Sequence, residues 1–301
     1  MAMRRICNVF FVIILFFVFD YGIEKVLHYG IDHYFGLNEH ADMLLVGHSH
    51  LMLAVDKKKM EDELGVKIAK YCREGVGVND RFYMVKQYLD SPFSDSLKVV
   101  MYGVDLCTFV SEGLSSNSYM LFYPFIDDDD IGNMVLESSD EVDYWSHKII
   151  RTYRYNDSNI MNAAIRGLFN DWSNKKNGVI DVENYKKFVA EGHERHIQMN
   201  PKLVAKFKET IKMITDRGVR VILINTPTID LLNNYEKDKF IAVCQWFQEF
   251  AKSQELVDYW DFNPEFASRH EIFYDRLHLN VKGQEIINKE IIKKCKVIPY
   301  L

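Results

Sequence analysis

The sequence predicts an α/β fold, a three-layer sandwich in which helices cover both faces of a central parallel five-stranded sheet. Apolar segments of strand length alternate with segments of helical length, the pattern of parallel strands joined by crossover helices. The first three strands each end in a turn that contains glycine and a polar residue. We expect the strands at residues 43–46, 66–72, 97–102, 219–225 and 256–260.

The end of the first strand is the most informative stretch of the sequence. The apolar residues 43–46 end abruptly in Gly47-His48-Ser49-His50, and we expect a turn there, followed by a helix from Ser49 to about Leu64. An uninterrupted apolar run is typical of a strand that is covered on both faces. Open α/β sheets carry their chemistry at the carboxyl ends of the strands, where helix N–H groups can hold negative charge. Ser49 is therefore a candidate nucleophile, although a serine here can also serve only as a helix cap.

The rest of the chain supplies further helices and one interruption. Helices are expected at residues 81–89, 202–217, 240–252 and 281–294. Residues from about 113 to 198 break the alternation and form a mostly helical insertion that could cover a site. Its aromatic side chains would either stack on sugar rings or fill a small core of their own. They are Tyr119, Phe122, Tyr123, Trp145, Tyr153, Tyr155 and Trp172.

The composition argues against several classes of protein. With 301 residues, 48% of them hydrophobic, the chain has ample material for a large core. Its net charge of -6 argues against a nucleic-acid binder. The five cysteines form no CxxC pair, so neither a disulfide scaffold nor a cysteine-bound structural zinc is indicated.

The N-terminus carries a membrane-targeting pattern. Arg4-Arg5 precedes an apolar run at residues 6–19, and a basic end before such a run stays in the cytoplasm. No small-x-small cleavage site follows, so we expect an uncleaved transmembrane anchor that contacts the membrane through residues 6–23. Residues 1–38 would be an anchor and connector, and residues 39–301 an exported α/β domain. A cleaved signal peptide and a buried helix of a soluble protein are the alternatives.

Asp275 and His278 are the candidate partners of Ser49. Acyl transfer by a serine needs an imidazole base and usually a carboxylate that holds the imidazole in one tautomer. The two residues are three positions apart, just before the last helix, so a turn can aim both side chains at one point. Alone, the aspartate could merely cap the helix and the histidine could lie on the surface. Donors for an oxyanion could come from the turns after the second and third strands, at Gly75, Gly77 and residues 103–105.

The order of these motifs resembles that of the SGNH, or GDSL-like, hydrolase superfamily. A serine follows the first strand, a glycine the second, an amide or carboxyl residue the third, and a D-x-x-H pair precedes the last helix. The matching residues are Gly47, His48, Ser49 and His50 in the first block, Gly75 or Gly77 in the second, Gly103, Val104 and Asp105 in the third, and Asp275, His278, Asn280 and Gly283 in the last. The resemblance covers the chain from about residue 40 to the end, apart from the insertion, and implies a flavodoxin-like sheet and acyl-ester chemistry.

Asp105 departs from the family pattern. The family's asparagine donates its amide N–H to the oxyanion, whereas a carboxylate cannot donate unless it is protonated, and its charge opposes an oxyanion. Either another donor serves, or Asp105 has a different role. The Gly-Val-Asp pattern, the first block and the N-terminal anchor are similar to the membrane-attached branch of the superfamily. That branch includes proteins similar to the teichoic-acid D-alanine transfer protein and the alginate O-acetylation proteins.

The resemblance implies a role for each site residue. Ser49 is the expected nucleophile, His278 the general base and then acid, and Asp275 the residue that orients it; no cofactor is expected. The N–H groups of Ser49 and of Gly75 or Gly77 would line the oxyanion hole. Water would resolve the acyl-enzyme in an esterase, and a sugar hydroxyl in an O-acyltransferase. The branch also implies a glycan or acylated polysaccharide of the cell envelope as substrate, and a membrane-bound acyl-donor protein as partner.

Two other hypotheses remain open. The imidazoles of His48, His50 and His278 could converge on zinc. His48 and His50 straddle the serine, however, so we expect them to point apart, with one of them shaping the pocket or hydrogen-bonding the substrate. Alternatively, the domain could be a catalytically impaired binding or assembly factor for envelope-polymer export, which Asp105 favours.

Overall fold

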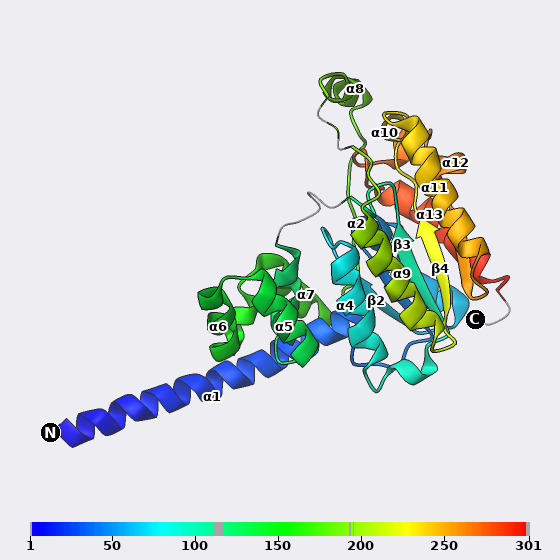
Figure 1. Ribbon diagram of the computed structural model, residues 1–301. Coiled ribbons are helices and arrows are strands. Elements are labelled where there is room, and N and C mark those ends of the chain that lie inside the picture. The colour runs from blue at the N-terminus through cyan, green and yellow to red at the C-terminus, as the bar shows by residue number, and fades with distance from the viewer. Residues whose placement is uncertain (1, 111–116, 193, 195, 299–301) are drawn as a thin grey trace. The chain divides into compact units, whose positions relative to one another are not determined.

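Figure 1 shows the computed structural model of the chain, which describes residues 2–110, 117–192, 194 and 196–298. The chain divides into two compact units. We call residues 1–38 and 117–171 the helical unit, and residues 39–116 and 172–301 the sheet unit.

The sheet unit is built on five parallel strands, as predicted. The strands are Met43–Gly47 (β1), Ile68–Cys72 (β2), Val99–Val104 (β3), Arg220–Asn225 (β4) and Val257–Asp261 (β5). Their order across the sheet is β2-β1-β3-β4-β5, and every neighbouring pair is parallel. All the carboxyl ends therefore lie at one edge. The strand order reverses at β1 and β3, the switch point at which open α/β sheets bind ligands.

Helices cover both faces of this sheet (Figure 1). The helices of the sheet unit are Ser49–Ala54 (α2), Lys57–Leu64 (α3), Val78–Leu89 (α4), Val182–Ala190 (α8), Pro201–Thr215 (α9), Asp230–Asn233 (α10), Lys237–Lys252 (α11), Asn263–Phe266 (α12) and Val281–Cys295 (α13), with 3₁₀ turns at Ser94–Ser96 (η1) and His270–Ile272 (η4). In one layer α2 and α3 pack against α13, and in the other α4 packs against α9. The four helices predicted after β2 are confirmed to within a few residues at each end.

The sequence of α9 shows why these helices form. Asn200 caps its first turn by accepting the N–H of Lys202 at 2.9 Å, and proline follows as the first helical residue. Phe207, Ile211 and Ile214 recur at helical spacing and are buried. A capped end and one apolar stripe fix both the start of the helix and the face that it turns to the sheet.

The prediction of one helix over residues 49–64 is wrong, because the structure has two helices there. The backbone is extended at Val55, and Asp56 caps the start of α3 by accepting the N–H of Lys59 at 3.1 Å. The capping aspartate restarts the helix instead of continuing it. As a result, α2 is only six residues long.

The helical unit contains the longest helix of the chain. Its elements are Ala2–Phe35 (α1), Ser118–Phe125 (η2), Asp129–Ser138 (α5), Glu141–Ile149 (α6), Arg151–Tyr155 (η3) and Ser158–Leu168 (α7). Among the described residues, α1 is the one helix long and apolar enough to cross a membrane. Only 6% of its most apolar window is buried, as a membrane anchor or a signal sequence requires.

The predicted insertion at residues 113–198 is shared between the two units. Residues 117–171 belong to the helical unit and residues 172–198 to the sheet unit, whereas residues 113–116 lie outside the described part of the chain. Three of the insertion's aromatic side chains, Phe122, Tyr123 and Tyr155, are buried within the helical unit. These three therefore fill a core of their own and do not form a sugar-stacking surface.

Candidate active site

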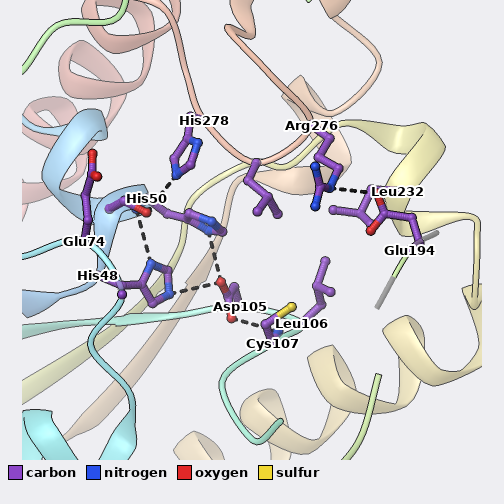
Figure 2. A pocket seen from close by; sticks show the side chains of 13 residues that line it. His48, His50, Glu74, Asp105, Leu106, Cys107, Glu194, Leu232, Arg276 and His278 are labelled. Carbon is purple, nitrogen blue, oxygen red and sulfur yellow. Dashed lines mark hydrogen bonds and ion pairs between the residues drawn. The ribbon is translucent and has the colours of Figure 1, made fainter. Parts of the chain in front are cut away.

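The structure brings together the three side chains that the sequence suggested as partners. Ser49 Oγ lies 2.7 Å from His278 Nε2, and His278 Nδ1 lies 2.8 Å from Asp275 Oδ2. Figure 2 shows His278 among the side chains that line a cavity in the sheet unit. A continuous serine–histidine–aspartate chain of hydrogen bonds is the arrangement that turns a serine hydroxyl into a nucleophile.

A tight turn between β1 and α2 presents Ser49. Gly47 ends the strand, His48 is the N-cap, and Ser49 is the first residue of the helix. A Cβ on Gly47 would lie 3.0 Å from the Cβ of Leu51, so glycine allows the helix to begin directly at the end of the strand. The serine hydroxyl therefore emerges at the carboxyl edge of the sheet.

The loop before α13 holds Asp275 and His278 in place. Asp275 Oδ1 accepts the N–H groups of Leu277 at 2.8 Å and of His278 at 2.9 Å. Asn280 caps α13 by accepting the N–H of Gly283 at 3.0 Å. A Cβ on Gly283 would lie 2.2 Å from a backbone oxygen, so no other residue fits without movement. Every named residue of the D-x-x-H-x-N-x-x-G pattern thus has a defined place in the loop.

Asp275 fixes the tautomer of His278. Burial by itself would raise the pKa of this carboxyl, but its hydrogen bond to His278, the charge of His278 and the N–H of Leu277 together lower the pKa below its usual value. Asp275 is therefore ionised at neutral pH and accepts the Nδ1–H of the imidazole. That leaves His278 Nε2 free to accept the proton of the Ser49 hydroxyl.

The triad opens onto a cavity of about 380 Å³. Its lining residues are His48, Ser49, His50, Glu74, Gly75, Asp105, Leu106, Cys107, Glu194, Leu232, Arg276, Leu277 and His278. Gly75 belongs to this lining and has a φ of +78°, a conformation that favours glycine. Gly77 does not line the cavity, and its N–H donates to Asp80 Oδ2 at 2.7 Å at the start of α4. Of the two glycines, Gly75 is the one placed to face a substrate.

Asp105 lies at the centre of a buried cluster with two histidines. Its Oδ2 is 3.0 Å from His48 Nε2 and 3.0 Å from His50 Nδ1, in contacts that are bent relative to the ring N–H directions. Its Oδ1 accepts the N–H of Cys107 at 2.8 Å and the hydroxyl of Thr108 at 3.1 Å. Figure 2 shows both imidazoles turned toward the carboxylate. The expectation that His48 and His50 point apart is wrong, because one carboxylate oxygen draws both rings to the same place.

The charge states within this cluster follow from its burial. Burial lowers the pKa of His48 to about 4, although Asp105 opposes the shift, so His48 is neutral at neutral pH. Burial by itself would raise the pKa of Asp105, but the close contacts of its carboxylate with the imidazoles of His48 and His50 hold the pKa well below its usual range. Asp105 is therefore an ionised carboxylate. It cannot supply the hydrogen bond that the asparagine of the SGNH pattern would donate.

The same cluster bears on the zinc hypothesis. The ligand atoms of His48, His50 and Asp105 lie within 4.8 Å of one another, whereas His278 is bonded to Ser49 and Asp275. His48 Nδ1 accepts the backbone N–H of His50 at 3.2 Å, so the hydrogen of the neutral ring is on Nε2, the atom that would have to bind the metal. Metal-binding histidines instead donate their other N–H to an acceptor. The donor set therefore does not fit a metal ion without rearrangement.

Arg276 and Glu194 line the cavity, but the sequence did not single them out. Arg276 Nε is 2.7 Å from Glu194 Oε1, and the Tyr185 hydroxyl donates to the same oxygen at 2.9 Å. Arg276 lies within the D-x-x-H motif, directly after Asp275. This position in the sequence was enough to predict that it lies near Asp275 and His278. Glu194 comes from the insertion, where no motif marks it.

Comparisons with known proteins add little to this geometry. No protein-family model matches the chain, and no curated protein matches it in sequence. One similar solved structure is a protein from Streptococcus pneumonia provisionally named a platelet activating factor, with 9% identity, a TM-score of 0.40, and coverage of 94% of this chain and 98% of that chain. Another is the lipase Lip_vut3 from the goat rumen metagenome, with 13% identity, a TM-score of 0.38, and coverage of 86% of this chain and 97% of that chain. Similarity this distant does not bear on function, which has to be inferred from the side chains of the site.

Proposed function

We propose that the chain is a serine-dependent ester hydrolase or O-acyltransferase of the SGNH type. The observation that carries the proposal is the pair of short hydrogen bonds that link Ser49 Oγ to His278 Nε2 and His278 Nδ1 to Asp275 Oδ2. A serine capping a helix has no need of an imidazole at 2.7 Å whose other nitrogen is held by an ionised carboxylate. These hydrogen bonds also lie at the switch point of the sheet, where open α/β sheets bind their ligands, which supports a catalytic role for Ser49.

The proposed reaction has two halves. The Ser49 hydroxyl adds to the ester carbonyl as its proton passes to His278 Nε2, and Asp275 stabilises the imidazolium that forms. Collapse of the tetrahedral intermediate expels the alcohol, which takes the proton from His278 and leaves an acyl-serine. Water or a sugar hydroxyl then gives a proton to His278 and attacks the acyl group. Ser49 regains its proton as the acid or the new ester leaves.

The substrate class that we propose is an acylated polysaccharide of the cell envelope. Two features support it: charged and polar side chains such as Glu74, Glu194 and Arg276 line the cavity, and α1 has the length and composition of a membrane anchor. An anchor with Arg4-Arg5 on its cytoplasmic side would hold the sheet unit outside the cytoplasm. Such a position favours a membrane-bound acyl donor as partner.

A binding or assembly factor with impaired chemistry is the competing proposal. The observation that favours it is the ionised carboxylate of Asp105, which stands where the SGNH pattern places an oxyanion donor. The two proposals differ in whether Ser49 ever carries an acyl group.

Replacing Ser49 by alanine tests this difference directly. We expect the full-length protein in detergent to release acetate from p-nitrophenyl acetate and from acetylated glycans, and Ser49→Ala to fall to the uncatalysed background. Mass spectrometry of added, unacetylated glycan would separate transfer from hydrolysis. If Ser49→Ala releases acetate as fast as the wild type, the serine mechanism is wrong. If the folded wild type releases none, the binding factor is the better description.

A further inference from the structure

Asp105 and His50 form a second aspartate–histidine pair in the cavity, next to the pair of Asp275 and His278. His50 Nδ1 lies 3.0 Å from Asp105 Oδ2. The ring of His50 is nearly perpendicular to that of His278, with an angle of 85° and 5.4 Å between the ring centroids. Both rings line the cavity into which Ser49 opens. The second pair therefore lies within reach of the atoms that react at Ser49.

The hydrogen bonds around Asp105 determine what each histidine can do. Asp105 Oδ1 is held by Cys107 and Thr108, so the carboxylate has a fixed position from which Oδ2 faces both rings. His48 uses both of its nitrogens within the cluster, because Nε2 faces Asp105 and Nδ1 accepts the N–H of His50. His50 uses only Nδ1 there. Its Nε2 is the nitrogen that remains for the cavity.

We propose that His50 is the oxyanion donor of this site, held as an imidazolium by Asp105 in place of the asparagine amide. The inference rests on the proposed serine mechanism. When Ser49 Oγ adds to the ester carbonyl, the π electrons of the carbonyl move to its oxygen. The Nε2–H of His50 and the N–H groups of Ser49 and Gly75 donate hydrogen bonds to that oxygen. When the alcohol leaves, the carbonyl re-forms, and His50 keeps its proton throughout.

This role for His50 explains how the carboxylate of Asp105 can stand where the SGNH pattern has an oxyanion donor. A carboxylate facing an oxyanion opposes catalysis, but an imidazolium between the two charges is attracted to both. Cys107 and Thr108 already donate hydrogen bonds to Asp105 Oδ1 and His48 is neutral, so none of these three balances the buried charge with a charged partner. His50 supplies that partner, and the pair delivers a donor to the place where the SGNH pattern has one.

Other charged and titratable groups line the same cavity as His50 or interact with His48 beside it. They are His48 before α2, Glu74 after β2, Arg81 on α4, Asp105 and Cys107 after β3, and Arg276 and His278 before α13. Arg81 is fully buried and donates to the backbone oxygens of Gly77 and Gly103, while Arg276 is paired with Glu194. His278 must be neutral to act as base when His50 is charged, so the mechanism needs the two histidines in opposite protonation states.

Substitutions at His50 test the proposal in the full-length protein with p-nitrophenyl acetate as probe. We expect His50→Ala to lower kcat by about 10²- to 10³-fold with little change in KM, since an oxyanion donor acts in the transition state. His50→Gln should stay within about tenfold of the wild type, because its amide can donate without a charge.

The matched control is His270→Gln. His270 Nε2 is 2.7 Å from Asp230 Oδ1, so it belongs to an aspartate–histidine pair outside the cavity, and its variant should keep the wild-type kcat. A wild-type kcat in His50→Ala would overturn the inference alone. Loss of activity to a chelator, with recovery on adding zinc, would overturn it in favour of a metal. A wild-type chain that does not react with the ester would overturn the inference and the proposed function together.

Discussion

A His278→Ala variant should lose about 10⁴-fold or more of the wild-type kcat for ester cleavage, with KM changing far less. Without the imidazole, the Ser49 hydroxyl has no acceptor for its proton, and the leaving alcohol has no donor. Steady-state kinetics on p-nitrophenyl acetate measures both constants. Added imidazole should restore part of the rate, because a free base can enter the space that the side chain leaves.

His270→Ala is the control for the loss of a histidine paired with an aspartate. His270 is partly exposed and bonded to Asp230 outside the cavity, so its removal should leave kcat within about twofold. If His278→Ala retains more than a tenth of the wild-type kcat, His278 is not the base, and the 2.7 Å contact with Ser49 has no catalytic meaning.

Gly167→Ala should disrupt the helical unit. A Cβ at this position would lie 1.7 Å from the backbone oxygen of Gly30 and 2.9 Å from the backbone nitrogen of Tyr34, so α7 and α1 would have to separate. Neither atom belongs to a flexible side chain that could move aside. We expect a loss of about 3 kcal/mol in local stability, as for overpacked cores, seen as roughly 100-fold faster hydrogen exchange at the α1 and α7 amides.

Gly22→Ala is the matched control in the same long helix. A Cβ on Gly22 has no atom within 4 Å, so alanine there should be neutral, or stabilising by up to about 1 kcal/mol through its helix propensity. Equal exchange rates in the two variants would show that α1 and α7 do not pack as closely as described.

The grouping of Ser49, Asp275 and His278 could be predicted because each of these residues follows from a local pattern. An apolar strand that ends in a glycine turn places Ser49 at the sheet edge, and the D-x-x-H spacing before a helix aims Asp275 and His278 at one point. The parallel order of the strands then brings these distant segments to the same edge. The five strands were predictable for the same reason, since their apolar runs are bounded by turn residues.

The cluster around Asp105 could not be predicted, because it depends on side-chain directions within a turn. No periodic pattern in the sequence predicts the directions of the His48 and His50 side chains, which flank Ser49. Only the folded turn brings both imidazoles to one carboxylate oxygen of Asp105. The place of Glu194 at the cavity could not be predicted either, for another reason. Its partner Arg276 is far away in sequence, and no local motif signals such a pair.

The central claim is that Ser49 is a nucleophile activated by His278. Its most direct test is to treat the full-length protein with a fluorophosphonate probe and to locate the adduct by peptide mass spectrometry. We predict one phosphonyl group on the Ser49 hydroxyl, with its formation greatly slowed in His278→Ala. A folded protein that stays unmodified at Ser49, or that labels equally well without the imidazole, would contradict the account.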